Sequence, residues 1–442
     1  MAAGSIGDAV TSARHSPAPS PIPTPGTLMP MRSRLAVGVG RLVAASSKAV
    51  HLGSGSVIGG RAALFVSPHL LRDLTAGREV VIVSATNGKT TTTRLIAAAL
   101  AGDRPVVSNS MGANMTAGIV AALGGAATNA TAVLEVDERW VAGVLRATSA
   151  GTVVLLNLSR DQLDRTQEVR KLAESWRTCL AATPPATVIA NADDPLVVWA
   201  AHAAPNVIWV ATGQDWRADA AGCPQCAGRI SFTGATWRCT DCDLARPDPT
   251  LTVEDTAIVT NEYRLPISMK LPGRVNIVNA AFALATARSL AVPEDIAVAG
   301  LQSVEEVAGR YRVTSLAGRP VRLLLAKNPA GWHEAIELLA DPPAPVVVAI
   351  NARIADGHDP SWLWDVDFER LRSRFVVATG ERRHDLAVRL RYADVEHATA
   401  DTIDEALRVA MGRPAYITGQ AVDIAANYTA FQEYFERVEG ST

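Results

Sequence analysis

The stretch Glu79–Thr93, EVVIVSATNGKTTTT, decides how this chain folds. A run of apolar residues leads into a short turn, Thr86-Asn87-Gly88, after which Lys89 and four threonines open a helix. A strand that ends in such a turn directs backbone N–H groups and a helix N-terminus at one point, which suits a phosphate group. The stretch therefore predicts a nucleotide site, in which Lys89 reaches the terminal phosphates and the hydroxyl of Thr90 or Thr91 holds Mg²⁺.

The match to the general phosphate-binding loop is incomplete, because Val83 stands where that pattern has its first glycine. Further along the chain, short apolar runs alternate with helical patterns, which predicts βαβ units and a mostly parallel sheet. The run Thr131–Glu138 is expected to be a buried strand whose terminal carboxylates, Glu135 among them, bind Mg²⁺ at the edge of the sheet. A solvated strand end is the alternative for these acids.

The bulk composition limits the classes of protein to consider. The 442 residues are too many for one ordinary core, so two or three domains are expected. With 42 basic and 44 acidic residues the net charge is −2, which provides no overall basic surface for nucleic acid. No apolar run is long enough to cross a membrane, and without an export signal a cytoplasmic location is expected. Residues 1–33, rich in Pro, Ser, Ala and Thr, are expected to be a disordered tail.

Four of the five cysteines form two matched pairs, Cys223-Pro-Gln-Cys226 and Cys239-Thr-Asp-Cys242. In a reducing compartment this pattern predicts a four-thiolate zinc ribbon, inserted at residues 221–246, with a redox-active pair as the alternative. Gly228 and Gly234 allow the tight turns that a short hairpin needs. A closed tetrahedral site has no open coordination position, so the zinc is expected to be structural. Three arginines against two aspartates make the segment a poor match to a phosphate backbone.

The fifth cysteine, Cys179, lies in a segment with helical periodicity. It lacks the glycine-flanked turn between strand and helix that exposes a nucleophile, so we expect a buried helical cysteine. Glutamine hydrolysis requires an activated nucleophile, usually Cys with His. The chain is therefore not expected to produce its own ammonia.

Five motifs in a fixed order resemble the Mur ligase superfamily. They are TNGKTTT at 86–92, Glu135, NLSRDQLDR at 157–165, NADDP at 191–195 and LPGRVNIVNAA at 271–281. The resemblance implies an α/β fold with a central parallel-sheet ATP-binding domain, here residues 34–316 with the zinc ribbon inserted, and a C-terminal α/β domain, here 317–442. It also implies an enzyme that uses ATP to phosphorylate a substrate carboxylate, after which an amine attacks the acyl phosphate.

The same resemblance implies roles for individual residues. Lys89 and Thr90 would contact phosphate and Mg²⁺, and Glu135 would be a second Mg²⁺ ligand. Asn276 or Asn279 would contact the adenine side of ATP.

Three departures from the typical family pattern narrow the expectation. Gln162 stands where typical members have histidine, the front of the chain is too short for a domain that grips a nucleotide sugar, and the zinc ribbon interrupts the central domain. Together with the segment Asn109–Gly118, these features resemble a branch of the superfamily that acts in peptidoglycan biosynthesis. That branch amidates the D-glutamate α-carboxyl of lipid II to D-isoglutamine with ammonia from a GatD-like glutaminase subunit.

A fresh α/β pattern starts near residue 317, with strands expected near Val321–Ala326, Pro345–Ile350 and Arg374–Thr379. The resemblance places Arg310 and Lys327 where Mur ligases carry residues that reach across the cleft to ATP. A structural role for either residue is the open alternative.

The segment Asn351–Asp365 combines acids, a histidine and two tryptophans on one expected loop. Tryptophans on a loop often mark an interface. The resemblance implies that this loop faces the glutaminase and that Asp356, or else Asp359, completes the partner's catalytic triad. A helix cap or a turn acid is the alternative for both residues.

Two other functions remain as alternatives. One is a ligase that adds an amino acid, of the Mur or folylpolyglutamate type. The other is a nucleotide-gated binding module whose zinc ribbon docks nucleic acid, which the near-neutral charge disfavours. No membrane anchor is visible, so proximity to a membrane is expected to come from the lipid-linked substrate.

Overall fold

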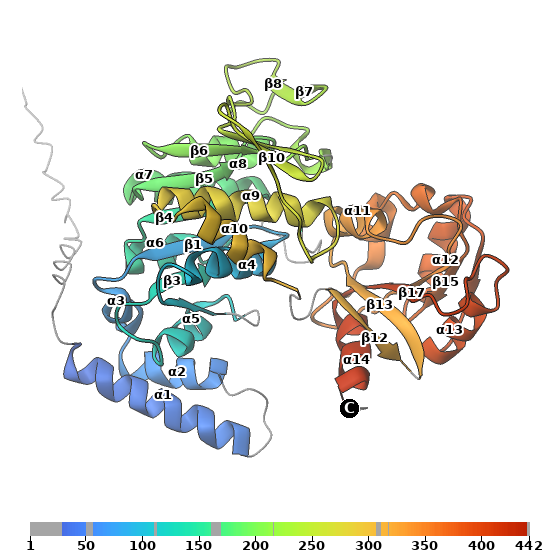
Figure 1. Ribbon diagram of the computed structural model, residues 1–442, viewed down its shortest axis with the longest axis horizontal. Helices are drawn as coiled ribbons and strands as arrows, with labels where there is room; N and C mark the ends of the chain where they lie inside the picture. Colours follow the sequence, from blue (N-terminus) through green and yellow to red (C-terminus); the bar gives the residue numbers. More distant parts are fainter. Residues whose placement is uncertain are drawn as a thin grey trace, which may run out of the picture.

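The computed structural model describes residues 29–49, 56–109, 113–160, 169–214, 216–305, 311–316 and 318–439. Figure 1 shows a helical hairpin at the blue end of the chain, a large sheet domain that carries a small β-hairpin, and a second sheet domain in orange and red.

A nine-stranded sheet forms the core of the central domain, in the order β11-β10-β9-β6-β5-β4-β1-β3-β2. From β2 across to β9 the strands run parallel, and β10 and β11 extend the sheet in the antiparallel sense. The predicted mostly parallel sheet is thus confirmed. The strands are β1 Val80–Ser84, β2 Val106–Ser108, β3 Thr131–Glu135, β4 Thr152–Leu155, β5 Thr187–Asn191, β6 Val207–Ala211, β9 Leu251–Glu254, β10 Ala257–Val259 and β11 Arg264–Pro266.

Helices cover both faces of this sheet, which explains why β1 is apolar throughout. Val80 and Ile82 belong to the core cluster on one face, and Val81 and Val83 belong to the cluster on the other. A parallel strand that is covered on both sides needs apolar residues at every position. The first face carries α3 Leu70–Thr75, α5 Thr116–Leu123, α6 Val141–Thr148, α7 Val169–Ala182 and α8 Pro195–Ala201; the second carries α4 Lys89–Ala101, α9 Arg274–Ser289 and α10 Glu294–Gln302. Outside α5, on the first side, lie α1 Met31–Ala49 and α2 Ser56–Val66.

The two pairs of cysteines flank a β-hairpin that is inserted between β6 and β9. Its strands, β7 Ile230–Thr233 and β8 Thr236–Cys239, pair in the antiparallel sense. Gly234 lies in the turn with a φ of 58°, a left-handed conformation that favours glycine. A short 3₁₀ helix, η1 Ala218–Ala220, precedes the hairpin.

The C-terminal domain is built on a six-stranded sheet in the order β12-β13-β17-β14-β15-β16, with β12 antiparallel and the other strands parallel. The predicted strands at Val321–Ala326, Pro345–Ile350 and Arg374–Thr379 correspond to β13, β14 and β15. The elements are β12 Tyr311–Leu316, β13 Arg319–Leu325, α11 Pro329–Glu337, β14 Val346–Ala349, η2 Pro360–Asp365, η3 Phe368–Leu371, β15 Val376–Thr379, α12 Arg383–Tyr392, β16 His397–Thr399, α13 Ile403–Met411, β17 Val422–Ala426 and α14 Tyr428–Glu439.

Two expected domain boundaries differ from the observed elements. Helix α1 begins at Met31, inside the expected tail 1–33, whose residues 1–28 lie outside the described part of the chain. Strand β12 pairs with β13, so the C-terminal sheet already includes Tyr311, ahead of the boundary expected at 317. Hairpin pairing depends on the partner strand, which local composition does not reveal. We therefore propose a domain boundary just before Tyr311.

Candidate functional site: a phosphate loop at the edge of the sheet

The loop between β1 and α4 is held by the exit of the neighbouring strand β4. Asn157 Oδ1 accepts a hydrogen bond from the Asn87 backbone N–H at 2.9 Å, and Asn157 Nδ2 donates to the Asn87 carbonyl at 3.1 Å. Thr86 Oγ1 accepts from the Ser159 backbone N–H at 3.0 Å and donates to the Ser159 carbonyl at 3.1 Å. The side chains of Thr86 and Asn157 thus shape the loop. Asn157 and Ser159 belong to the 157–165 motif but were not predicted as site residues.

Gly88 gives the loop its final turn. Its φ is 82°, and it caps the N-terminus of α4. A Cβ at this position would lie 3.0 Å from Asn279 Oδ1, so the glycine also allows α9 to approach the loop. The first N–H groups of α4 are directed at this point, as the sequence predicts for a phosphate-binding turn.

Lys89 is folded back onto its own loop. Its Nζ donates to the carbonyls of Ala85 and Thr86 and lies 3.0 Å from Glu138 Oε2. Both side chains of this ion pair are about nine-tenths buried. Glu138 is one of the terminal carboxylates that the sequence predicts as Mg²⁺ partners, but in the structure it pairs with Lys89, a contact that the sequence did not predict. A bound phosphate would compete with the Glu138 carboxylate for the ammonium group.

Glu135 lies at the end of β3, next to β1, and its backbone is fixed by Asn109. Asn109 Oδ1 accepts from the Glu135 N–H and Asn109 Nδ2 donates to the Glu135 carbonyl, both at 2.8 Å. In the carboxylate, Oε1 accepts from Asn114 Nδ2 at 3.4 Å, but Oε2 is buried and has no hydrogen-bond partner among the described residues. A buried carboxylate oxygen without a donor is costly unless a cation binds there. The surroundings of Glu135 therefore fit its predicted role as a Mg²⁺ ligand.

The threonines that follow Lys89 differ in their burial and in their hydrogen bonds. Thr90 is half-buried in the first turn of α4 and Thr91 is buried. Thr92 donates a hydrogen bond to Asn279 Oδ1 at 3.1 Å, which joins α4 to α9. The Thr90 hydroxyl stays a predicted Mg²⁺ ligand.

A pocket with a cavity volume of about 100 Å³ opens beside the loop, between the central and the C-terminal domain. Asn279, one of the two predicted adenine-side residues, lines this pocket. Asn276 is not among its described lining residues, and its Nδ2 donates to the Pro272 carbonyl at 2.6 Å. The lining comprises Asn87, Gly88, Leu156, Asn157, Asn191, Thr212, Gly213, Gln214, Trp216, Arg274, Val275, Val278, Asn279, Phe282, Ala330, His333, Glu334 and Glu337.

The C-terminal domain contacts the phosphate loop directly. Asn87 Nδ2 donates to Asn328 Oδ1 at 3.2 Å, and the same oxygen caps α11 by accepting from the Gly331 N–H at 2.8 Å. Lys327 is not among the described lining residues of the pocket, and its Nζ lies 4.8 Å from the ring centroid of Tyr428. Arg310 and Gln162 lie outside the described residues, so their predicted roles stay predictions.

Candidate metal centre: four cysteines that brace the pocket

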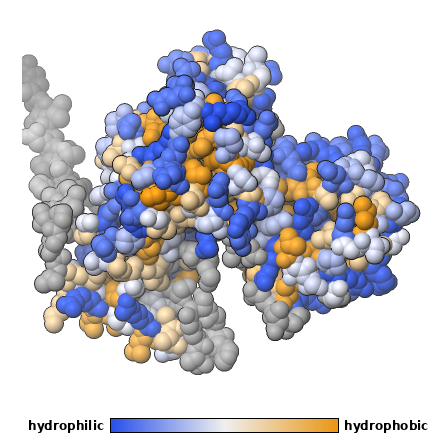
Figure 2. Space-filling view, in the orientation of Figure 1, coloured by the Kyte–Doolittle hydropathy of each residue, from blue (hydrophilic) through white to orange (hydrophobic). Residues whose placement is uncertain are grey.

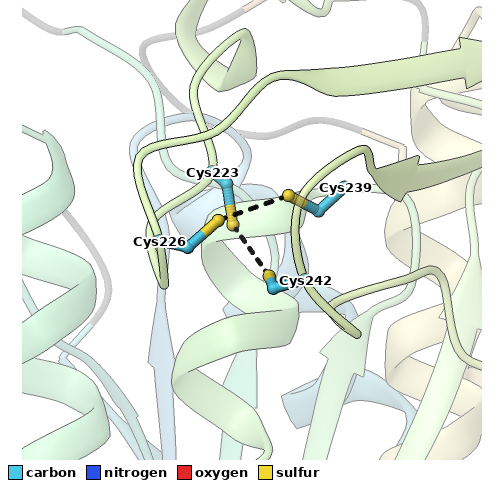
Figure 3. A group of neighbouring side chains, drawn as sticks. All are labelled: Cys223, Cys226, Cys239 and Cys242. Atoms are coloured by element: carbon cyan, nitrogen blue, oxygen red, sulfur yellow. Dashed lines mark hydrogen bonds between the residues drawn. The ribbon is translucent and has the colours of Figure 1, made fainter.

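The four predicted zinc ligands lie together at the base of the inserted hairpin (Figure 3). Their sulfur atoms are all within 4.8 Å of one another, with Cys226 to Cys239 at 3.5 Å and Cys223 to Cys242 at 3.7 Å. Four sulfurs at about 2.3 Å from one zinc ion are about 3.8 Å apart, so the observed spacing fits this metal. Backbone N–H groups of the knuckles donate to Cys226 Sγ and Cys239 Sγ at 3.4 Å, which favours thiolate ligands.

The ribbon is packed against the wall of the pocket. Buried Trp237 donates from Nε1 to the Ala192 carbonyl at 3.0 Å. Arg246 Nε lies 2.6 Å from Asp193 Oδ1. The other carboxylate oxygen of Asp193 accepts from the backbone N–H groups of Thr212 and Gly213, both at 2.7 Å. The Arg246–Asp193 ion pair thus connects the pocket segment 212–214 to the cysteine cluster. Local sequence patterns did not predict this contact.

Asp194, the next residue of the same motif, caps helix α8. It accepts from the backbone N–H groups of Leu196 at 2.9 Å and Val197 at 3.2 Å, and from Leu158 in the loop after β4 at 2.9 Å. Complete burial raises the pKa of its carboxyl to about 6. Through Asp194, the motif at 191–195 therefore connects the segment after β5 with the loop after β4.

Cys179 lies in α7 and is buried, as predicted. Burial raises the pKa of its thiol to about 11. Its Sγ contacts the carbonyl of Trp176 within the helix at 3.2 Å. A neutral, enclosed thiol in this position is not an activated nucleophile.

Candidate partner surface on the C-terminal domain

The two candidate triad aspartates have different surroundings. Asp356 is buried and accepts hydrogen bonds from the Thr429 N–H at 2.9 Å, from the Thr429 hydroxyl and from the Arg353 N–H at 3.2 Å. It thereby caps the N-terminus of α14. Asp359 is exposed and caps η2 through the Ser361 N–H at 2.9 Å, a bond that lowers the pKa of its carboxyl.

Exposed aromatic residues lie next to the Asp359 loop. Trp364 and Tyr392 form an edge-to-face pair with ring centroids 5.4 Å apart, and both rings are more than half exposed. Asp359 and Trp364 line the same shallow pocket, with Val388 of α12. This surface has the composition that protein interfaces favour.

Similarity to known proteins

A parallel sheet with a phosphate-type loop, buried acids at the next strand and a second α/β domain across the pocket define a Mur ligase-like protein. Family models agree: the Mur ligase middle domain matches residues 83–287, and the MurT ligase C-terminal domain matches residues 325–431. The fold also resembles that of a pseudomurein peptide ligase type C from Methanothermus fervidus (TM-score 0.65, 17% identity, 85% of this chain and 81% of that chain). MurF from Acinetobacter baumannii is similar as well (TM-score 0.62, 16% identity, 86% and 80%).

Two curated relatives carry the name lipid II isoglutaminyl synthase (glutamine-hydrolyzing) subunit MurT. The protein from Streptococcus pneumoniae is 30% identical over 423 residues, which is 87% of this chain and 92% of the relative. The protein from Staphylococcus aureus strain COL is 28% identical over 411 residues, with 85% and 93% covered. The chain belongs to the MurT family.

Proposed function

We propose that this chain is the ATP-dependent synthetase subunit of an amidotransferase that converts the D-glutamate α-carboxyl of lipid II into D-isoglutamine. ATP would phosphorylate the carboxylate, and ammonia from a GatD-like glutaminase subunit would displace the phosphate. The observation that carries the proposal is the buried Oε2 of Glu135 beside the loop of Lys89, an oxygen that has no hydrogen-bond partner among the described residues. The names of the two relatives supply the substrate and the type of reaction.

Each residue of the edge site has a task in this reaction. Lys89 would exchange Glu138 for the transferred phosphoryl group and hold its negative charge. Glu135 and the Thr90 hydroxyl would hold Mg²⁺, which neutralises phosphate charge when bound. The pocket lined by Asn279 would take the nucleoside end of ATP.

The reaction consists of two displacements. A substrate carboxylate oxygen attacks the γ-phosphorus and ADP leaves, which yields an acyl phosphate. Ammonia then attacks the acyl carbon and phosphate leaves, which yields the amide. Closing the domains through the Asn87–Asn328 hydrogen bond would protect the acyl phosphate from water.

The proposal needs a separate source of ammonia. Four cysteines are grouped as candidate metal ligands, and Cys179 is buried with a raised thiol pKa. The exposed surface around Asp359, Trp364 and Tyr392 offers a place for a glutaminase to bind. Asp356 could complete the partner's triad only by giving up the cap of α14, whereas Asp359 is already accessible.

The four-cysteine cluster would bind zinc as a structural ion. It has no open position for substrate if all four sulfurs coordinate. Its contribution to function would be indirect, through the Arg246–Asp193 ion pair and the pocket segment 212–214.

The test is amidation of lipid II by the purified chain with ATP, Mg²⁺ and ammonium, with the product identified by mass spectrometry. Lys89→Ala and Glu135→Ala should abolish amidation with the zinc content unchanged. Lys270→Ala is the matched control, because this lysine is exposed and pairs with Glu305 on the surface. Full activity of Lys89→Ala would refute the site, and no amidation by the wild type would refute the reaction.

A further inference from the structure

The N-terminal helices α1 and α2 pack against each other through their smallest residues. A Cβ on Gly40 would lie 2.8 Å from the Gly59 carbonyl oxygen and 3.0 Å from Ala63 Cβ, and a Cβ on Gly59 would lie 2.9 Å from Ala44 Cβ. The two backbones therefore meet directly. In a helical hairpin that only stabilises a domain, the large apolar side chains would be expected at this contact. In this hairpin the most exposed large apolar side chains lie away from the contact between α1 and α2.

Three large apolar side chains of α1 face away from the protein, whereas Val37 packs against the core. Met31, Leu35 and Leu42 are 88%, 63% and 69% exposed, and their spacing places them on one stripe of the helix. The buried positions of α1, such as Ser33 and Ala36, lie on the opposite side. Two residues of α2, Ile58 at 46% and Phe65 at 90% exposure, add exposed apolar surface to the same hairpin, and we call these five residues the hairpin face.

The hairpin carries a charge opposite to that of the remaining chain. From Met29 to Arg72 the sequence has six basic residues and no Asp or Glu, whereas residues 73–442 have 35 basic and 43 acidic residues. Exposed Arg34 flanks the stripe of α1, and exposed Arg61 lies between the two apolar residues of α2. Figure 2 shows hydrophilic and hydrophobic residues interspersed over this hairpin, at the lower left. Basic residues around exposed Leu, Met and Phe are typical of helices that lie on anionic membranes.

The hairpin is firmly attached near the candidate site. Ser33 Oγ donates to Asp73, which ties α1 to α3. On its other side α2 packs against α5, which lies in Figure 1 between the hairpin and the sheet. The segment before α5 supplies Asn114, the donor to Glu135 Oε1. One helix therefore separates the hairpin from the candidate metal ligand.

We propose that the hairpin face binds the surface of an anionic lipid bilayer. Among the described residues, no helix combines the length and the hydropathy needed to span a bilayer, so the contact would be peripheral. The apolar side chains would enter the boundary between headgroups and acyl chains, and the arginines would contact lipid phosphates. This membrane site does not depend on the proposed reaction, and it departs from the expectation that only the substrate brings the chain to a membrane.

The test is flotation of the full-length chain with vesicles of phosphatidylcholine, with or without phosphatidylglycerol, in the absence of ATP and lipid II. We expect binding only to the anionic vesicles, with a decrease at high salt. The double variants Leu35→Ser/Leu42→Ser and Arg34→Gln/Arg61→Gln should each reduce partitioning about tenfold or more.

Two matched controls address general surface effects. Val313→Ser and Ile417→Ser each remove an apolar side chain that is 59% exposed on the C-terminal domain, and neither should change flotation. Zinc content and circular dichroism check the fold of every variant. Because no substrate is present, failure here is distinct from failure of the amidation reaction.

Four outcomes would overturn the proposal. The wild type would fail to float with anionic vesicles, or both double variants would float as well as the wild type. In the third, sedimentation velocity would show a dimer that Leu35→Ser/Leu42→Ser converts to a monomer, which would assign the face to a second copy of the chain. Vesicle binding that appears only after residues 1–28 are deleted would instead assign the face to that segment.

Discussion

Glu135, the proposed Mg²⁺ ligand, allows metal binding to be separated from folding by one substitution. Its Oε2 is buried without a hydrogen-bond partner among the described residues, and its Oε1 has one long bond from Asn114. Glu135→Gln keeps the volume of the side chain and can accept the same bond, but it removes the buried charge. The variant should therefore stabilise the metal-free chain and inactivate the enzyme.

The magnitude follows from the cost of the unpartnered oxygen. A buried polar group without a partner costs about 1–3 kcal/mol, and a charged group costs more. Glutamine leaves a neutral NH₂ group at the same place, so only part of that cost is recovered. We expect Glu135→Gln to raise the free energy of unfolding by about 1–2 kcal/mol in the absence of metal and nucleotide.

Glu138→Gln is the matched control, with the same change of charge three residues away. Glu138 Oε2 lies 3.0 Å from the buried Lys89 Nζ, so the substitution leaves that ammonium group without its counter-charge. Breaking a buried ion pair costs about 3–5 kcal/mol, and because glutamine can still accept a hydrogen bond we expect a loss of about 3 kcal/mol.

Urea denaturation in EDTA measures both variants, and release of ADP in Mg²⁺ measures activity. Saturating Mg²⁺ and ATP should raise the denaturation midpoint of the wild type but not that of Glu135→Gln. The reasoning would be refuted if Glu135→Gln destabilised the chain as much as Glu138→Gln does, or if it retained Mg²⁺-dependent ADP release.

Four further predictions concern the cysteines and the partner loop. Removal of the proposed zinc with a chelator should weaken ATP binding about tenfold, as measured by isothermal titration calorimetry, because the ribbon contacts the pocket wall through the Arg246–Asp193 ion pair. An unchanged affinity for ATP would show that the ribbon does not affect nucleotide binding. Burial raises the thiol pKa of Cys179 to about 11, so at pH 8 it should react with iodoacetamide about 100-fold more slowly than an exposed thiol. Mass spectrometry should detect rapid labelling only after the chain is unfolded. Rapid labelling of the folded chain would contradict the burial of Cys179. Asp356→Asn should lower the free energy of unfolding by about 1 kcal/mol through the weakened cap of α14. In a complex with the glutaminase, Asp356→Asn, or else Asp359→Asn, should impair amidation with glutamine but not with ammonium; equal loss with both donors would leave only a structural role.

The sequence predicted those features whose information is local. The apolar run, the turn and Lys89 specify a strand, a loop and a helix start within fifteen consecutive residues, and the structure has β1, Gly88 and α4 at these places. The cysteine spacing predicted the four-sulfur cluster, because each pair forms its own turn. Strands buried on both faces were recognisable from unbroken apolar runs.

Contacts between distant segments could not be predicted in the same way. The partner of Lys89 proved to be Glu138, which depends on how β3 and α4 lie beside each other. The ion pair between Arg246 and Asp193 joins segments 53 residues apart, and no local sequence pattern predicts this contact. The outward stripe of α1 has ordinary helical periodicity, so only the observed packing of α2 reveals that its apolar side chains face away from the protein.

The most direct test of the central claim is ADP release by the purified chain with lipid II, measured with ammonium, with glutamine and with single amino acids, each with and without a GatD-like glutaminase. The account predicts turnover with ammonium by the chain alone, and turnover with glutamine only when the glutaminase is present. Turnover driven by an amino acid without any partner would contradict it and would make the chain an amino-acid-adding ligase.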